Sequence, residues 1–152
     1  MEHLVINKHK IETTPEKAFQ AILDCKMWPE FVPGVELVEV LDEKGNKMTR
    51  RLHTRINGKI NKMKTECEIF PEQHKMLYKQ VERPWPISSN MGEWYIEKVD
   101  EKTIEMFLTH RFKVKYSIIG DLIGMFIIKP LFIYSHNKKV LKAFAKRLQV
   151  SN

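Results

Sequence analysis

The stretch KMTRRLHTRINGKINKMKTECEIF, residues 47–70, decides the fold. At its centre Asn57-Gly58 is the strongest short-range signal for a β-hairpin with a two-residue turn. In residues 59–70 one alternating face carries the less charged side chains, which are Asn61, Met63, Thr65, Cys67 and Ile69. The other face carries Lys62, Lys64, Glu66 and Glu68. Because successive side chains of a strand point to opposite faces, the pattern predicts a hairpin with one face toward a core and one toward water.

The same alternation extends outward over much of the chain. The predicted strands are residues 35–42, 47–57, 59–70, 75–82, 92–99 and 103–116, and short turn signals separate them. Six consecutive strands with tight connections predict an antiparallel meander. Residues 2–11 predict one more strand, which adds an edge or closes the sheet.

Helical patterns stand on both sides of the meander. Thr14-Pro15-Glu16 is a helix start that predicts a helix over residues 15–25, and residues 28–34 predict a short second helical turn. From residue 118 the period is again helical, and Pro130 is expected to kink or divide this helix. Its predicted inner stripe is Leu122, Phe126, Ile133, Asn137, Val140, Phe144 and Leu148.

The order of these elements predicts the fold class α+β. A curved seven-stranded antiparallel sheet would wrap a long C-terminal helix, with two short helices after the first strand, in a single domain over residues 1–152. A curved sheet that grips one helix is hard to pack solid, so we expect an internal apolar cavity.

Composition excludes several classes of function. With 43% hydrophobic and 30% charged residues the chain is globular, and its net charge of +7 comes with no nucleic-acid motif, so we expect no nucleic-acid partner. Residues 118–135 are interrupted by Asp121, Lys129 and Pro130, and we expect a soluble, cytoplasmic protein. Cys25 and Cys67 have no metal-ligand or redox spacing, so no metal is expected.

The predicted inner face is apolar with a few polar interruptions. These are Thr65, Cys67, Tyr78, Gln80 and His110, with Asn137 added from the helix. Such a mixture suits a ligand site and also an ordinary core. His110 is a candidate general acid or base or a core histidine with a satisfied hydrogen bond, and Cys67 is a candidate nucleophile or an inert thiol.

The chain resembles the START-like superfamily, also described as helix-grip or polyketide cyclase/dehydrase-like proteins, and within it the bacterial aromatic polyketide aromatase/cyclases. The resembling pieces are residues 14–19 (TPEKAF), 28–35 (WPEFVPGV), 57–58 (NG), 91–94 (MGEW), 109–112 (THRF) and 136–139 (HNKK). The resemblance implies a cavity for a hydrophobic or polyaromatic small molecule, with no metal and no organic cofactor.

The resemblance also implies site residues. The family's histidine falls on His110 and its helix asparagine on Asn137, whereas the position of its strand arginine is occupied by Cys67, two residues after Thr65. The expected catalytic residue is His110. The expected ligand-binding residues are Trp28, Phe31, Met63, Thr65, Cys67, Met76, Tyr78, Gln80, Trp94, Phe112, Phe126, Ile133 and Asn137.

Two functions remain open at the level of sequence. One is a polyketide cyclase/dehydratase that uses acid/base chemistry, and the other is a non-catalytic binding or transport protein for a lipid or an isoprenoid quinone. The apolar residues 118–134 predict a lid, a homodimer contact or transient contact with a membrane surface, and the chain is expected to be a monomer or a homodimer.

Overall fold

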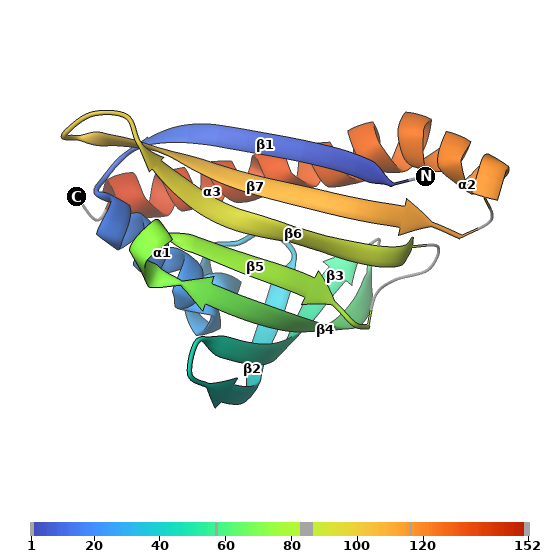
Figure 1. Ribbon diagram of the computed structural model, residues 1–152, viewed down its shortest axis with the longest axis horizontal. Coiled ribbons are helices and arrows are strands. Elements are labelled where there is room, and N and C mark those ends of the chain that lie inside the picture. The colour runs from blue at the N-terminus through green and yellow to red at the C-terminus, as the bar shows by residue number, and fades with distance from the viewer. Residues whose placement is uncertain (1, 57, 83–86, 116, 151–152) are drawn as a thin grey trace.

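The computed structural model describes residues 2–56, 58–82, 87–115 and 117–150 (Figure 1). The elements in chain order are β1 (His3–Glu12), α1 (Pro15–Leu23), η1 (Cys25–Glu30), β2 (Val35–Lys44), β3 (Lys47–Ile56), β4 (Lys59–Phe70), η2 (Pro71–Gln73), β5 (Lys75–Gln80), β6 (Ile87–Lys98), β7 (Thr103–Val114), α2 (Ser117–Ile123), η3 (Gly124–Tyr134) and α3 (Ser135–Val150).

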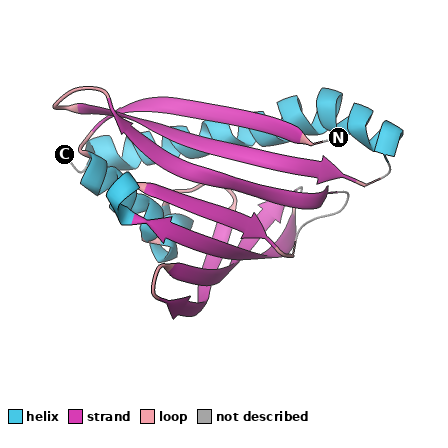
Figure 2. Cartoon of the chain, in the orientation of Figure 1, coloured by secondary structure: helices cyan, strands magenta, loops and turns pink. Residues whose placement is uncertain are grey.

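The seven strands form one antiparallel sheet in the order β1-β7-β6-β5-β4-β3-β2. The sheet is strongly curved, and the C-terminal helical run lies along one of its faces (Figure 2). This arrangement confirms the helix-grip α+β fold, and β1 adds an edge beside β7 instead of closing the sheet. The chain has the form of a soluble α+β domain, in which one face of the sheet is covered and the other is wet.

The strands β3 and β4 pair as the predicted hairpin requires. The two strands pair from Lys47 with Glu68 up to Ile56 with Lys59, which leaves a two-residue turn between them. Gly58 has φ of 79°, a left-handed conformation that glycine adopts without strain. Asn57 lies outside the described residues.

The N-terminal helix also begins where the sequence predicts. Thr14 is its N-cap, and the Thr14 hydroxyl accepts a hydrogen bond from the Lys17 amide at 3.3 Å. Its buried face consists of Ala18, Phe19 and Ile22. The second short helix spans Cys25–Glu30 and therefore starts three residues before the predicted turn.

The strand β6 begins well before its predicted start. Local propensity places the start of the sixth strand at Gly92, whereas β6 begins at Ile87. Ser88, Ser89 and Asn90 are poor strand formers, but β7 continues alongside them and Asn90 pairs with Phe112. Pairing with a neighbouring strand therefore outweighs the local preference.

The main core lies between the sheet and the helices α1, η1 and α3. At its centre Phe144 of α3 is fully buried, with ring centroids 5.9 Å from Trp28, 5.2 Å from Trp94 and 5.0 Å from Phe31. These contacts hold η1, β6 and α3 together. A second apolar cluster of Val5, Phe112, Val114 and Ile128 lies where β1 and β7 meet η3.

Pro130 does not divide the C-terminal helical run. Helical residues continue without a break from Ser117 to Val150, and across Gly124–Tyr134 the helix takes up π-helical hydrogen bonding. A π-helix has more residues per turn than an α-helix, so the inner stripe changes phase. Leu122, expected on that stripe, is 53% exposed, while Gly120, Gly124 and Ile128 are buried. Farther along, Asn137, Val140, Phe144 and Leu148 are buried as predicted.

Candidate functional site

Two rows of residues cross the inner face of the sheet from β3 to β7. The strand registers align Met48, Cys67, Tyr78, Gly92 and His110 in the first row. They align Arg50, Thr65, Gln80, Asn90 and Phe112 in the second row. Paired residues of adjacent strands lie side by side on one face. The sheet therefore brings the predicted polar residues of β4, β5 and β7 together.

The second row begins with a residue that the sequence analysis missed. Arg50 is 3% exposed, and its guanidinium carbon lies 4.5 Å from the centroid of the Trp28 ring. Among the described residues, Nε and Nη1 of Arg50 have no hydrogen-bond partner. A buried cation is costly unless it is paired, so these two unpaired donors mark a place where a ligand oxygen could bind.

A signal for Arg50 is present in the sequence. Residues 48, 50 and 52 share one face of β3, and Met48 and Leu52 mark that face as apolar. An arginine between them is a cation on an inner face. The sequence analysis sought the cation only on β4, where Cys67 stands, but the sheet supplies one on the adjacent strand, paired with Thr65.

The electrostatic influence of Arg50 reaches the first row. Burial raises the pKa of the Cys67 thiol and raises that of the Tyr78 hydroxyl well above its usual value, while the charge of Arg50 opposes both shifts. The Tyr78 hydroxyl donates a hydrogen bond to the Thr109 carbonyl oxygen at 2.7 Å. Cys67 therefore lacks the thiolate character that a nucleophile needs.

His110 is held by the residue that the resemblance paired with it. Asn137 Nδ2 lies 2.9 Å from His110 Nδ1, and the Tyr78 ring packs edge-on at 5.4 Å between centroids. Because the amide nitrogen of Asn137 is a donor, His110 Nδ1 accepts and Nε2 carries the proton. Burial, with a smaller effect from His136, lowers the pKa of His110 to about 3. The imidazole is therefore a neutral hydrogen-bond donor at neutral pH.

This pKa predicts a pH-dependent stability. Folded His110 stays neutral down to about pH 3, whereas in the unfolded chain it takes up a proton near its ordinary pKa of 6.5. The unfolded state binds more protons between these values, so the free energy of unfolding falls as the pH falls. From about pH 7 to about pH 5, wild type should lose roughly 2 kcal/mol more than His110→Gln, as measured by urea unfolding. An equal loss in both proteins would contradict the assignment.

The second row also contains an amide pair. Asn90 Nδ2 donates to Gln80 Oε1 at 2.8 Å, and Asn90 Oδ1 is buried without a hydrogen-bond partner among the described residues. The row thus offers unpaired donors at Arg50 and an unpaired acceptor at Asn90. Such a set suits a ligand with one oxygen that accepts a hydrogen bond, such as a carbonyl, and one that donates, such as a hydroxyl.

The other predicted ligand residues divide between core and inner face. Trp28, Met76 and Trp94 are buried in the main core, and Phe112 lies in the second cluster with Ile133 packed against it. Phe31 is half-buried, with the Arg147 guanidinium 5.2 Å from its ring centroid, and Met63 is half-buried on β4. The Phe126 side chain lies outside the described part of the chain.

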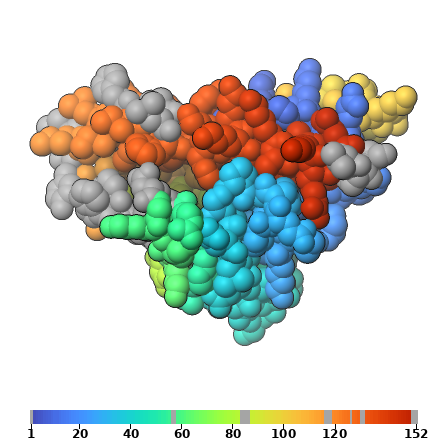
Figure 3. Space-filling model, turned by 180° about the vertical axis from the view of Figure 1, so that it is seen from behind, coloured from blue at the N-terminus to red at the C-terminus, as the bar shows by residue number. Residues whose placement is uncertain are grey.

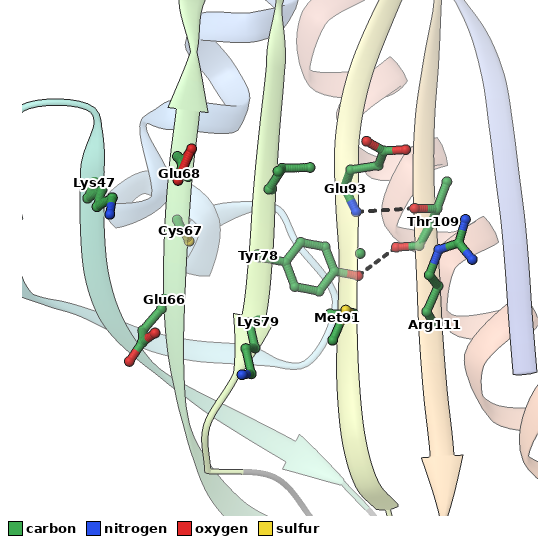
Figure 4. Close-up of a pocket in the computed structure, with 12 residues that line it drawn as sticks. Lys47, Glu66, Cys67, Glu68, Tyr78, Lys79, Met91, Glu93, Thr109 and Arg111 are labelled. Carbon is green, nitrogen blue, oxygen red and sulfur yellow. Dashed lines mark hydrogen bonds between the residues drawn. The ribbon is translucent and has the colours of Figure 1, made fainter. Parts of the chain in front are cut away.

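The opposite face of the sheet has a hollow of about 540 Å³ that is lined by residues of β3 to β7 (Figure 4). It has mixed charges, with Lys47, Lys79 and Arg111 against Glu66, Glu68 and Glu93, and it is open to solvent. It is also lined by Leu77, Met91 and Thr109 and by three residues of the first row, Cys67, Tyr78 and Gly92. An open, charged hollow does not suit a hydrophobic ligand, so the inner face is the better candidate site.

Within residues 2–56, 58–82, 87–115 and 117–150, no group of three His, Cys, Asp or Glu side chains could hold a metal ion. Cys25 and Cys67 are both buried and free.

Comparison with solved structures shows the same fold in proteins of different kinds. The Zhui aromatase/cyclase from Streptomyces sp. R1128 is similar with 21% identity and a TM-score of 0.73, over 99% of this chain and 88% of that one. A protein from Thermus thermophilus is similar with 19% identity and a TM-score of 0.83, over 99% of both chains. Norcoclaurine synthase from Thalictrum flavum is similar with 11% identity and a TM-score of 0.77, over 99% and 96%.

The sequence comparisons are more selective. No curated protein matches the chain. The family model described as polyketide cyclase / dehydrase and lipid transport matches residues 11–132, which is most of the chain and confirms the START-like resemblance. The chain therefore belongs to the polyketide cyclase/dehydrase and lipid transport family.

Proposed function

We propose that the chain binds a hydrophobic or polyaromatic small molecule with keto or enol oxygens, between the inner face of the sheet and the C-terminal helical run. The observation that carries the proposal is Arg50, a buried guanidinium with two donors that have no partner among the described residues. A ligand oxygen with negative or partial negative charge would satisfy these donors.

The surroundings of Arg50 support the same ligand class. Trp28 stacks on the guanidinium, and Met48, Met76 and Leu108 belong to the apolar core beside it. Thr65, Gln80, Asn90 and His110 are the few polar groups of the two rows. An apolar wall with a few placed polar groups is typical of small-molecule sites, and an internal cavity is part of the proposal.

The most specific form of the proposal is a polyketide aromatase/cyclase-like enzyme, a cyclase/dehydratase. In an aldol closure an enolate carbon attacks a ketone carbon, a carbon–carbon bond forms, and the ketone oxygen receives the π electrons and then a proton. Loss of water next removes this oxygen and a proton from the neighbouring carbon. Arg50 would stabilise the enolate oxygen, because a cationic donor in a buried site binds developing negative charge strongly.

In this mechanism His110 has a narrower role than the general acid or base expected from sequence. With a pKa of about 3, it cannot hold a proton for transfer at neutral pH. Its Nε2–H would donate to the ketone oxygen under attack, with Asn137 fixing the ring. Hydrogens between two keto groups are acidic, so the enolate can form without a strong base.

A second candidate function is a non-catalytic carrier of a lipid or an isoprenoid quinone. Two observations favour it. His110 is a poor proton carrier, and the segment of α2 and η3 exposes many apolar side chains. In this form Arg50 and His110 would bind the oxygens of a ligand that is released chemically unchanged. We also propose that the protein is located in the cytoplasm.

Cyclisation of a poly-ketone mimic in vitro tests the enzyme. We expect wild type to accelerate ring closure, and His110→Ala to slow it about 100-fold, as expected for loss of one buried donor to a developing charge. His53→Ala is the matched control, because His53 bonds with Glu39 outside the two rows. Equal rates for wild type and His110→Ala would remove His110 from the mechanism.

Native mass spectrometry after mild extraction from the expression host tests the carrier. A co-purified quinone or lipid that Arg50→Met no longer retains would support transport. A pocket that is empty in every preparation, together with ring closure by wild type, would support the enzyme.

A further inference from the structure

The segment of α2 and η3, residues 117–134, turns large apolar side chains toward solvent. They are Ile119, Leu122, Ile123, Met125, Ile127, Phe132 and Tyr134, with exposed fractions from 38% to 70%. A surface helix normally turns its polar side chains outward. An exposed cluster of this size is a mark of an interaction surface.

The packing of the segment explains why these side chains are outside. Its buried residues include Gly120 and Gly124, and a Cβ on Gly124 would lie only 2.6 Å from His3 Nε2. A Cβ on Gly120 would overlap the Lys115 carbonyl oxygen. The segment therefore approaches the rest of the protein through small residues and Ile128, and it leaves larger residues free for another contact.

The net charge of the chain comes from this segment and from the residues that flank it in the sequence. Residues 113–152 contain eight lysines and arginines and one acid, whereas residues 1–112 contain 18 of each sign. The excess of +7 therefore belongs entirely to the last 40 residues. The exposed lysines there are Lys113, Lys115, Lys129, Lys138, Lys139, Lys142 and Lys146.

Residues 113–152 themselves supply a single carboxylate. The one acid, Asp121, has a side chain only 21% exposed, with Oδ1 3.7 Å from His3 Nε2. Glu30 pairs with Arg147 near the far end of α3, at 3.1 Å. The view from behind shows the orange segment at one end of the molecule and the lysine-bearing α3, in red, continuing from it (Figure 3).

We propose that the α2–η3 segment docks on the surface of an anionic lipid bilayer. Its apolar side chains would enter the boundary between headgroups and acyl chains, and the lysines would face the anionic headgroups. A second copy of the chain is a poorer occupant, since a symmetric contact would bring two cationic surfaces together.

The segment would lie in the interface and not cross the membrane. Residues Ile119–Gln149 are long and apolar enough to span a bilayer by length and composition. However, Asn137, Val140 and Phe144 of this run are buried against the sheet, and a spanning helix would have to leave that core. The docking does not depend on the proposed ligand or its chemistry.

Vesicle flotation tests the docking. We expect wild type to float with vesicles of phosphatidylcholine and phosphatidylglycerol, and to float much less with phosphatidylcholine alone or in high salt. Leu122→Ser with Phe132→Ser should lower the partition coefficient about tenfold or more, because two exposed apolar anchors are lost. Lys138→Glu with Lys139→Glu should lower it by a similar factor, because each lysine contributes about fivefold.

Leu37→Ser with Ile60→Ser is the matched control. These side chains are 48% and 45% exposed on β2 and β4, and the control should bind like wild type. Failure of wild type to float with either vesicle would overturn the proposal. Equal binding by wild type, Leu122→Ser with Phe132→Ser, and Lys138→Glu with Lys139→Glu would overturn it too. A concentration-dependent dimer that Leu122→Ser with Phe132→Ser dissolves, without vesicle binding, would replace the bilayer by a second copy.

Discussion

Replacement of Arg50 by methionine is expected to lower ligand binding or ring closure about 100-fold while the free energy of unfolding stays the same or rises. Arg50 is buried, and two of its donors have no partner among the described residues. Folding therefore carries the cost of desolvating its charge. Methionine fills a similar volume without that cost, but it offers nothing to a ligand oxygen.

Three proteins and two measurements separate these effects. Urea unfolding gives the stability, and either the cyclisation rate or the dissociation constant of a retained ligand gives the function. Arg51→Met is the matched control. Arg51 is the next residue of the same strand, and its side chain bonds with exposed Glu82. If Arg50→Met unfolds more easily than Arg51→Met and keeps full function, Arg50 is structural and the proposed site is wrong.

Replacement of Gly92 by alanine is expected to destabilise the fold by about 3 kcal/mol or more. An added Cβ would overlap the Thr109 carbonyl oxygen and lie 2.6 Å from the Tyr78 hydroxyl. Neither can move freely, since the Thr109 carbonyl belongs to β7 and the Tyr78 hydroxyl donates to it. The substitution would separate β6 from β7 beside His110. The free energy of unfolding should therefore fall, and His110 should lose part of the burial that keeps it neutral.

Gly45→Ala provides the comparison. Gly45 has φ of 58° and nothing within 4 Å of an added Cβ, so alanine there meets only backbone strain, about 1 kcal/mol. Urea unfolding of both variants under the same conditions measures the difference. A loss for Gly92→Ala no larger than that for Gly45→Ala would mean that the sheet can open locally at little cost.

The fold was largely predictable because its signals are local. Asn57-Gly58 predicts one hairpin, alternation along residues 59–70 fixes which face of β4 is inner, and Thr14-Pro15 starts the first helix where the structure has it. The start of β6 was not predictable in this way. Ser88, Ser89 and Asn90 extend only because β7 lies beside them, and a partner far along the sequence leaves no trace in local propensity.

The candidate site was predictable only in part, for a related reason. Periodicity places Thr65, Tyr78 and His110 on the inner face, but it does not tell which strand supplies a cation to a shared row. Arg50 enters the site through the register of β3 with β4. The pKa of His110 depends on how deeply the folded protein buries it. The sequence could therefore place His110 on the inner face, but it could not predict that His110 is neutral.

The π-helical stretch Gly124–Tyr134 has a consequence for insertions and deletions in the gene. A π-turn holds one residue more than an α-turn, and it joins two helical halves that face the sheet with different phases. Deletion of a single codon within it, with the bonding of the remaining residues unchanged, would rotate α2 by up to roughly 100° relative to α3, which is the turn of one helical residue. Gly120 and Gly124 would then leave the sheet while Phe144 stayed in the core. The number of residues in this stretch thus decides which side chains of α2 face the sheet and which face solvent.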